Sequence, residues 1–250
     1  MSILDSFDPA PEAILEPSHA APPLPGFPET AVLTFQPSLS AWAAGQEGAE
    51  VLCAIPVFFK IPVIRLPYRG GEYALYQTLM GGAVSAAMLE EIIARGARRV
   101  VLFGSCGSLL KELPPGHLVV PTEARRDEGV SWHYLPPADY VPIPTAQRTC
   151  RVLEELGLPH WRGRVWTTDA LYRETRRNTA RRRAEGCGAV DMECASLAAV
   201  CLFRGVEFYP FFYTEDKLDG EQWDPGLLGK LPQDAKEAYL RIALELARRL

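Results

Sequence analysis

Residues 73–110 constrain the fold more than any other part of the chain. They contain an apolar run at 73–79, the amphipathic stretch AVSAAMLEEIIARG, and directly after it a second apolar run, RRVVLFG. The two runs have the length and composition of buried strands, and the apolar residues between them share one face of a helix. A strand, a helix and a strand in so short a stretch predict two parallel strands with a right-handed crossover. The chain is therefore expected to adopt an α/β fold.

The rest of the chain alternates in the same way between short apolar runs and amphipathic stretches. Further strands are expected at residues 31–35, within 50–66, and at 117–121, 163–168 and 206–213. Helices are expected at 145–157, 174–185, 191–204 and 234–250. No repeat or interdomain linker interrupts this pattern, so we expect a single domain over residues 30–250.

Residues 1–29 form a segment of a different kind, because they are rich in proline. Proline lacks a backbone N–H and clashes with the preceding turn of a helix, so the segment is a poor candidate for a helix or a central strand. We expect an N-terminal arm that is either disordered or laid over a neighbouring subunit.

Composition argues against several classes of function. Of 250 residues 48% are apolar, enough for a sizeable core, and the formal net charge of −5 gives no basic surface for nucleic acid. No uninterrupted apolar run has the length of a membrane span. The six cysteines lack the spacing of zinc ligands, so no metal site is predicted. With neither a secretory leader nor a disulfide framework, the sequence favours the reducing cytoplasm.

Four short motifs place small or polar residues near the ends of predicted strands or at the start of a predicted helix. They lie at residues 104–107 (GSCG), 167–172 (TTDALY), 190–195 (VDMECA) and 213–217 (YTEDK). Backbone N–H groups in a glycine turn can receive an anion or a sugar oxygen, and strand ends are where α/β sheets bind ligands. Each motif also has a structural interpretation, such as capping of the helix at 191–204 by Asp191.

Taken together and in order, these motifs resemble those of the purine nucleoside and uridine phosphorylase family, the hexamer-type branch of the nucleoside phosphorylase superfamily. The stretch LMGGAVSAA before the glycine turn is similar to a Met-Gly stretch of the same family. The similarity to the family covers roughly residues 17–250. The resemblance implies a three-layer α/β/α sandwich with a mixed central sheet. It also implies a dimer-based homo-oligomer, up to a hexamer, that acts on a small-molecule nucleoside without a cofactor and with phosphate as a possible co-substrate.

The resemblance implies roles for individual residues. Glu193 matches the glutamate that accepts hydrogen bonds from the ribose 2′- and 3′-hydroxyls, Met192 stands beside it, and Met80 matches a methionine under the sugar. Asp216 matches the aspartate that protonates a purine near N7, and Glu215 precedes it in the base-binding loop.

Other matched positions extend the expected site. Leu171 and Tyr172 fall where the family has an aromatic pair at the base, and Leu171 departs from that pattern. His19 has the spacing of an N-terminal histidine that reaches a neighbour's 5′-hydroxyl, which would make the arm part of a shared site. Gly104 and Ser105 are expected on the nucleophile side.

The family's phosphate-binding arginines are replaced in this chain. The loop Gly-Asp-Pro-x-Arg reads FQPSL at residues 35–39, so Leu39 takes the place of its arginine, and Leu102 stands where a second arginine precedes the glycine turn. A third arginine, lent by a neighbouring subunit, would fall near Phe59. Lys60 and Arg65 are the nearest substitutes in sequence. A phosphate dianion in a closed site needs charge-assisted donors, so the standard phosphate site is not expected.

Three functions remain open at this point. The leading hypothesis is a pentosyltransferase of purine salvage that cleaves the N-glycosidic bond of a purine nucleoside with an altered phosphate site. The retained Asp216 favours a purine over uracil. The alternatives are a phosphate-independent nucleosidase and a non-catalytic homologue that binds nucleosides.

Overall fold

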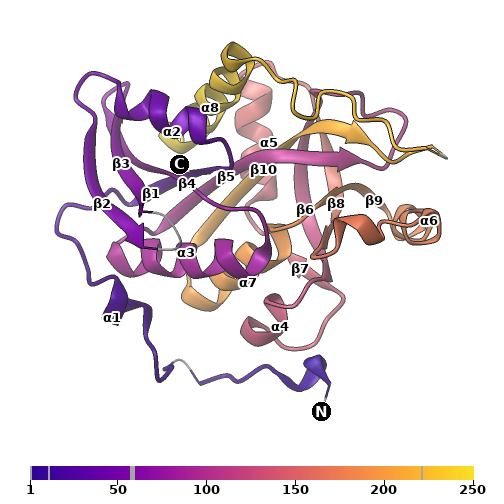
Figure 1. The fold of residues 1–250 in the computed structure, drawn as a ribbon, viewed down its shortest axis with the longest axis horizontal. Helices are drawn as coiled ribbons and strands as arrows, with labels where there is room; N and C mark the ends of the chain where they lie inside the picture. Colours follow the sequence, from indigo (N-terminus) through magenta and orange to yellow (C-terminus); the bar gives the residue numbers. More distant parts are fainter. Residues whose placement is uncertain (1, 11, 57–59, 221) are drawn as a thin grey trace.

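The computed structural model describes residues 2–10, 12–56, 60–220 and 222–250. The position near Phe59, where the sequence comparison places a neighbour's arginine, lies outside these residues. Figure 1 shows a strongly twisted central sheet with helices packed on both sides.

Ten strands of the described chain form one mixed sheet. They are β1 (Thr30–Thr34), β2 (Glu50–Pro56), β3 (Lys60–Tyr68), β4 (Gly71–Gln77), β5 (Arg99–Ser108), β6 (Leu118–Asp127), β7 (Tyr140–Pro142), β8 (His160–Thr168), β9 (Cys187–Asp191) and β10 (Glu207–Lys217). The helices are α1 (Pro17–Ala20), α2 (Pro37–Ala44), α3 (Gly82–Arg95), α4 (Ser131–Tyr134), α5 (Ala146–Glu155), α6 (Arg176–Ala184), α7 (Cys194–Arg204) and α8 (Gln233–Arg248), with short 3₁₀ helices η1 (Ile3–Asp5) and η2 (Leu171–Arg173).

Strand β5 is the centre of the sheet. It pairs in parallel with β1 on one side and with β10 on the other, and its last residues pair antiparallel with β9. Because β10 also pairs with β6, and β6 with β8 and β8 with β9, these five strands close into a ring. Strands β1, β4, β3 and β2 extend from it. The run from Val100 to Phe103 is wholly apolar because both faces of β5 are covered.

The predicted crossover around α3 is present, with one difference. Strands β4 and β5 run parallel, but β1 lies between them, with Val32 opposite Leu75 of β4 and Val101 of β5. A local pattern determines the direction of two strands. It does not determine whether a third strand from elsewhere in the chain inserts between them.

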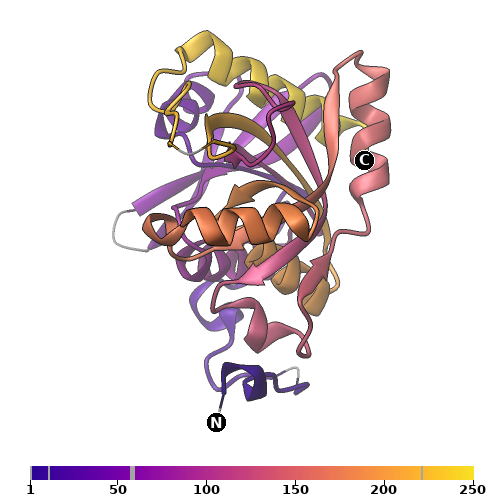
Figure 2. The ribbon, with the colours of Figure 1, turned by 90° about the vertical axis from the view of Figure 1, so that its right-hand side faces the viewer.

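Helices cover the sheet as the expected three-layer arrangement requires. Helices α2 and α8 pack on β1 and β4, and α5 packs on β6, β8 and β10. Helix α7 packs on β6, β8 and β10 and against α3. In Figure 1, α2 and α8 lie above the sheet and α3 and α7 below it, and Figure 2 shows α6 outside the ring of strands. In the described residues, no helix has both the length and the apolarity needed to cross a membrane.

The N-terminal arm lies along this chain's own helices (Figure 1). Helix η1 contacts α4, and α1 contacts α3. Ala21 and Phe27 are buried, and the backbone N–H of Leu24 donates to the carbonyl of Arg95 at the end of α3 (3.0 Å). Contact with a neighbouring subunit stays a prediction.

Two elements near the site differ from expectation. Strand β9 was not predicted, and α7 starts at Cys194 because the chain is still extended at Asp191. Helix α2 begins at Pro37, within residues 35–39, which the sequence comparison aligned with the family's phosphate-binding loop. Proline suits the first turn of a helix, since its missing N–H has no partner there anyway.

An ion pair between α3 and α7 generates a stability prediction. Glu90 is buried, and Arg204 donates from Nε to Oε2 (2.8 Å) and from Nη2 to Oε1 (3.0 Å). Arg204→Met leaves the carboxylate without its cation, so we expect the free energy of unfolding to fall by about 3 kcal/mol in urea denaturation. The double variant Glu90→Gln/Arg204→Met carries no buried charge and should recover most of this loss. A double variant less stable than Arg204→Met would contradict the prediction.

Candidate active site

A cavity of about 220 Å³ opens where the last residues of β5, β9 and β10 meet. Loops after β1, β4 and β8 complete its wall. The residues expected from the sequence that line it together are Met80, Ser105, Leu171, Met192, Glu193 and Asp216. Residues from five separate stretches of the chain thus converge on one cavity.

Asp191 organises one end of this cavity. It is the last residue of β9, and its Oδ2 accepts hydrogen bonds from the backbone N–H groups of Glu193 (2.8 Å) and Cys194 (2.6 Å). These bonds satisfy the open N–H groups at the start of α7. The hydroxyl of Thr167 donates to Asp191 Oδ1 (2.7 Å) and accepts from the N–H of Ala195 (3.0 Å), which ties β8 to the same turn.

Glu193 is thereby left to face the cavity. Its Oε1 accepts a hydrogen bond from the backbone N–H of Gly81 at 2.6 Å, and the residue is only 6% exposed. Gly81 has a φ of 105°, a backbone conformation that residues other than glycine rarely adopt. Burial, and then the charge of Asp191, raises the pKa of Glu193 to about 8. The carboxyl group is held in place but poorly solvated.

Two further carboxyl groups line the cavity, Asp216 and Glu174. Oδ2 of Asp216 accepts a hydrogen bond from the indole N–H of Trp223 (2.7 Å), and burial raises the pKa of Asp216. Gly107 leaves room for it, since a Cβ there would come within 3.2 Å of Asp216 Oδ1. Burial, and then the charge of Asp216, raises the pKa of Glu174 to about 7.

Glu174 is the lining residue with a reactive side chain that sequence reasoning missed. It lies two positions after Tyr172, the last residue of the TTDALY motif, in the turn between η2 and α6. An acidic residue so close to a motif expected to bind ligand was the feature of the sequence that could have identified it.

The third side of the cavity is closed by Phe35. Its ring lies against Gly104, where a Cβ would come within 2.7 Å of the ring, so Gly104 is part of the packing. Ser105 lines the cavity beside it, and its hydroxyl donates a hydrogen bond to the carboxylate of Glu215. Burial raises the pKa of Glu215, which lies behind Ser105 and outside the cavity lining.

Four residues expected from the sequence lie away from the cavity in this chain. Tyr172 is 91% exposed on η2, and His19 is exposed on α1, where its Nδ1 accepts from the N–H of Glu16 (3.3 Å). Lys60 is exposed at the start of β3. Arg65 is held by ion pairs and by a hydrogen bond to the carbonyl of Gly26 (3.0 Å).

The charge of the cavity is of one sign. Its charged lining residues are Glu174, Asp191, Glu193 and Asp216, and within the described part of the chain no lysine or arginine joins them.

The two leucines at the arginine positions do not reach the cavity either. Leu39 on α2 and Leu102 on β5 are both fully buried in the hydrophobic core. Arginine at either position would place an unpaired guanidinium among apolar side chains in this packing.

Comparison with known proteins gives consistent results. The family model described as the phosphorylase superfamily matches residues 43–248. Protein R802 of Acanthamoeba polyphaga mimivirus is 26% identical over 163 residues, 64% of each chain. The DeoD-type purine nucleoside phosphorylase of Caldanaerobacter subterraneus subsp. tengcongensis is 25% identical over 185 residues, 72% of this chain and 78% of that one. The guanosine phosphorylase of Halorubrum lacusprofundi is 24% identical over 193 residues, 73% of this chain and 78% of that one.

A solved structure shows the same fold. The crystal structure of AMP nucleosidase from Bacteroides thetaiotaomicron superposes with a TM-score of 0.71 and covers 89% of this chain and 88% of its own, at 20% identity.

The raised pKa of Glu193 predicts a pH dependence of stability. The ordinary value for glutamate is 4.5, and between it and about 8 the folded chain holds a proton that the unfolded chain has lost. The free energy of unfolding should therefore fall as pH rises through this window. Glu193→Gln should remove its share of the fall and leave the shares of Asp191 and Glu174, whose pKa values are raised to about 6 and about 7.

Urea denaturation at intervals between pH 5 and pH 8 measures this slope. The matched control is Glu112→Gln, an exposed glutamate outside the cavity lining, which should follow the parent chain. A Glu193→Gln variant with the parent's slope would show that the carboxyl is ionised throughout.

Proposed function

We propose that this chain, which belongs to the phosphorylase superfamily, cleaves the N-glycosidic bond of a purine nucleoside and transfers the ribosyl group to water. The superfamily comprises nucleoside phosphorylases and nucleosidases, which act on small-molecule nucleosides. The observation that carries the choice of water is the acidic cavity, which lacks a described cation.

Glu193 supports binding of the sugar. An ionised carboxylate accepts hydrogen bonds from two vicinal hydroxyls, so a bound ribose favours the ionised form of Glu193. One of its oxygens already accepts a hydrogen bond from the N–H of Gly81. Met80 and Met192 line the same end and supply apolar contact for the sugar ring. Because the carboxylate is buried, its hydrogen bonds to the ribose compete little with water.

Asp216 supports departure of the base. Negative charge builds on the leaving purine as the glycosidic bond breaks, so a proton donor at N7 lowers the barrier. Burial raises the pKa of Asp216, which increases its protonated fraction. With Oδ2 bonded to Trp223, Oδ1 is the atom that can donate to the base.

The nucleophile side favours water over phosphate. A phosphate dianion would enter a cavity lined by four carboxyl groups, and repulsion together with desolvation opposes it. The ring of Phe35 fills the position above Gly104. The Ser105 hydroxyl interacts with the carboxylate of Glu215, so it can pass its own proton to Glu215 while its oxygen takes one from the attacking water. We therefore propose Glu215, expected at the base from the resemblance, as a group that acts through Ser105 on the attacking water.

A phosphate-dependence assay tests the acceptor. Purified protein is incubated with adenosine, inosine, guanosine and uridine, with and without phosphate, and free base is measured by chromatography. We expect release of purine bases without phosphate and no acceleration when it is added. If phosphate accelerates release of the base, the acceptor is phosphate and not water. If no base is released, the chain is a nucleoside-binding homologue.

The glutamate variant tests the sugar assignment in the same assay. Glu193→Gln weakens charge-assisted hydrogen bonds to the ribose, so kcat/KM should fall roughly 10-fold to 100-fold. Glu112→Gln should match the parent. Since Glu193→Gln is expected to be at least as stable as the parent above neutral pH, unfolding would not account for the loss. A kcat/KM equal to that of the parent would remove Glu193 from the sugar site.

The aspartate variant tests the proton donor. Asp216→Asn keeps the size of the side chain and a hydrogen-bonding group at Oδ1 but supplies no proton. We expect kcat to fall by about two to four orders of magnitude with a smaller change in KM. Steady-state kinetics on a purine nucleoside measure both constants, and an unchanged kcat would exclude Asp216 as the acid.

A further inference from the structure

Glu174 has a place in the cavity but no role in the steps derived above. It lines the end that holds Asp216 and Leu171. Within the described residues, its carboxylate has no hydrogen-bond or ion-pair partner. A half-buried carboxylate that faces a cavity and has no partner is available to bind a ligand.

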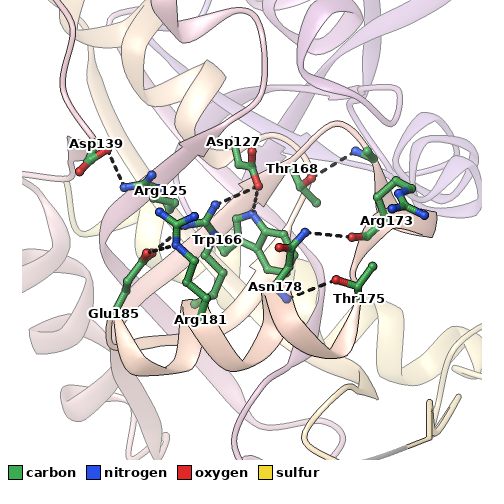
Figure 3. A network of polar contacts seen from close by, with 12 residues as sticks. Arg125, Asp127, Asp139, Trp166, Thr168, Arg173, Thr175, Asn178, Arg181 and Glu185 are labelled. Carbon is green, nitrogen blue, oxygen red and sulfur yellow. Dashed lines mark hydrogen bonds and ion pairs between the residues drawn. The ribbon is translucent and has the colours of Figure 1, made fainter.

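The turn that carries Glu174 is held on both sides (Figure 3). Its own backbone N–H donates to the carbonyl of Leu171 (3.2 Å). The hydroxyl of Thr175 accepts from the N–H of Asn178 (3.3 Å), which caps α6, and the side-chain amide of Asn178 donates to the carbonyl of Arg173 (3.3 Å). The backbone on each side of Glu174 is therefore tied to the first turn of α6.

Helix α6 is in turn fixed to the sheet. Asp127 at the end of β6 accepts hydrogen bonds from the indole of Trp166 (2.9 Å) and from Arg182 of α6 (3.2 Å). Arg182 also pairs with Glu185 (2.8 Å) and is only 6% exposed. Figure 3 shows Asp127 and Trp166 of this network on the upper side of the helix, with Glu185 at its far end. Such support keeps a binding group at a fixed position relative to the cavity.

Glu174 and Asp216 form a pair of neighbouring carboxyl groups. Two such groups resist simultaneous ionisation, so one of them retains a proton while the other is charged. The indole of Trp223 occupies Asp216 Oδ2, so a proton on Asp216 belongs on Oδ1. In the empty cavity the charge of Asp216 raises the pKa of Glu174, so the shared proton is on Glu174. The N7 of a bound purine accepts a hydrogen bond, so it favours the proton on Asp216 Oδ1 and leaves Glu174 ionised. With a base bound, the pair then presents one hydrogen-bond donor, Asp216, and one acceptor, Glu174.

This donor and acceptor match one kind of purine edge. Adenine presents N7, an acceptor, next to its 6-amino group, a donor, whereas guanine presents two acceptors, N7 and O6. Leu171 and Leu218 line the same end and offer apolar contact for the faces of a ring. A 6-oxo group opposite an ionised carboxylate would set two acceptors against each other.

We propose that Glu174 determines base specificity by accepting a hydrogen bond from the 6-amino group, so that the site selects 6-aminopurine nucleosides over 6-oxopurine nucleosides. This inference rests on the proposed function, because it assumes that the base lies against Asp216. It adds a residue outside the stretches that resemble the phosphorylase family.

Three ligands that differ at position 6 test the proposal. Adenosine carries an amino group, inosine an oxo group, and purine riboside only hydrogen. The parent chain should prefer adenosine over inosine in kcat/KM by roughly 10-fold to 100-fold. Glu174→Gln, whose amide can donate to O6, should bring the ratio close to one. Glu174→Ala removes the acceptor for the 6-amino group, so the ratio of kcat/KM for adenosine to that for purine riboside should fall by a similar factor.

The comparison across ligands separates specificity from stability, because a folding defect would lower all three rates equally. Glu112→Gln is the matched control, and circular dichroism checks the fold of each variant. Binding of the same ligands by calorimetry gives the ratio without turnover. Equal use of adenosine and inosine by the parent, or a ratio unchanged in Glu174→Gln, overturns the role of Glu174 while the proposed function stands. A chain that neither cleaves nor binds any of the three ligands overturns both.

Discussion

The capping of α7 by Asp191 is the interaction on which the site depends. One carboxylate receives the N–H groups that open the helix, and through Thr167 it also joins β8 to β9. Without it, the first turn of α7 would need other partners, and Glu193 would be the nearest carboxylate to supply them. Because Asp191 takes the structural role, Glu193 can be held against Gly81 and directed into the cavity. A buried acid with a raised pKa is thus a product of how the helix begins.

The same division between structural and chemical groups recurs around the cavity. The indole of Trp223 donates a hydrogen bond to one oxygen of Asp216 and leaves the other oxygen available. Glu215 accepts the hydrogen bond of the Ser105 hydroxyl, which leaves the lone pairs of that oxygen available. In each of these groups, a neighbouring residue binds one atom and thereby leaves the other atom free for a ligand. The cavity tolerates several acids because burial raises their pKa values, so fewer of them are charged at the same time.

Much of the fold and part of the site could be predicted from the sequence, for identifiable reasons. The strand–helix–strand pattern and the VDMECA stretch are local, so they predict α3, β5 and the position of Glu193. The insertion of β1 between β4 and β5 and the pairing of β5 with β10 are non-local, and no short pattern encodes them. Sequence reasoning missed Glu174 for the same reason. Its proposed role depends on its position near Asp216, which is distant in the sequence. The leucines at positions 39 and 102 revealed the absence of arginines, but only packing shows that Phe35 fills the vacated side.

The contact between Gly82 and Ser196 has a consequence for how such a site can evolve. A Cβ at Gly82 would come within 2.3 Å of the Ser196 hydroxyl oxygen, so the first turns of α3 and α7 touch with no spare space. The sugar end of the cavity is built on these two turns, whereas Glu174, Trp223 and Leu228 belong to surface loops. Substitutions at the sugar end disturb close packing, but those at the base end exchange side chains at modest cost to folding. If the proposed function holds, the end that meets the base can therefore change more readily than the end that holds the sugar.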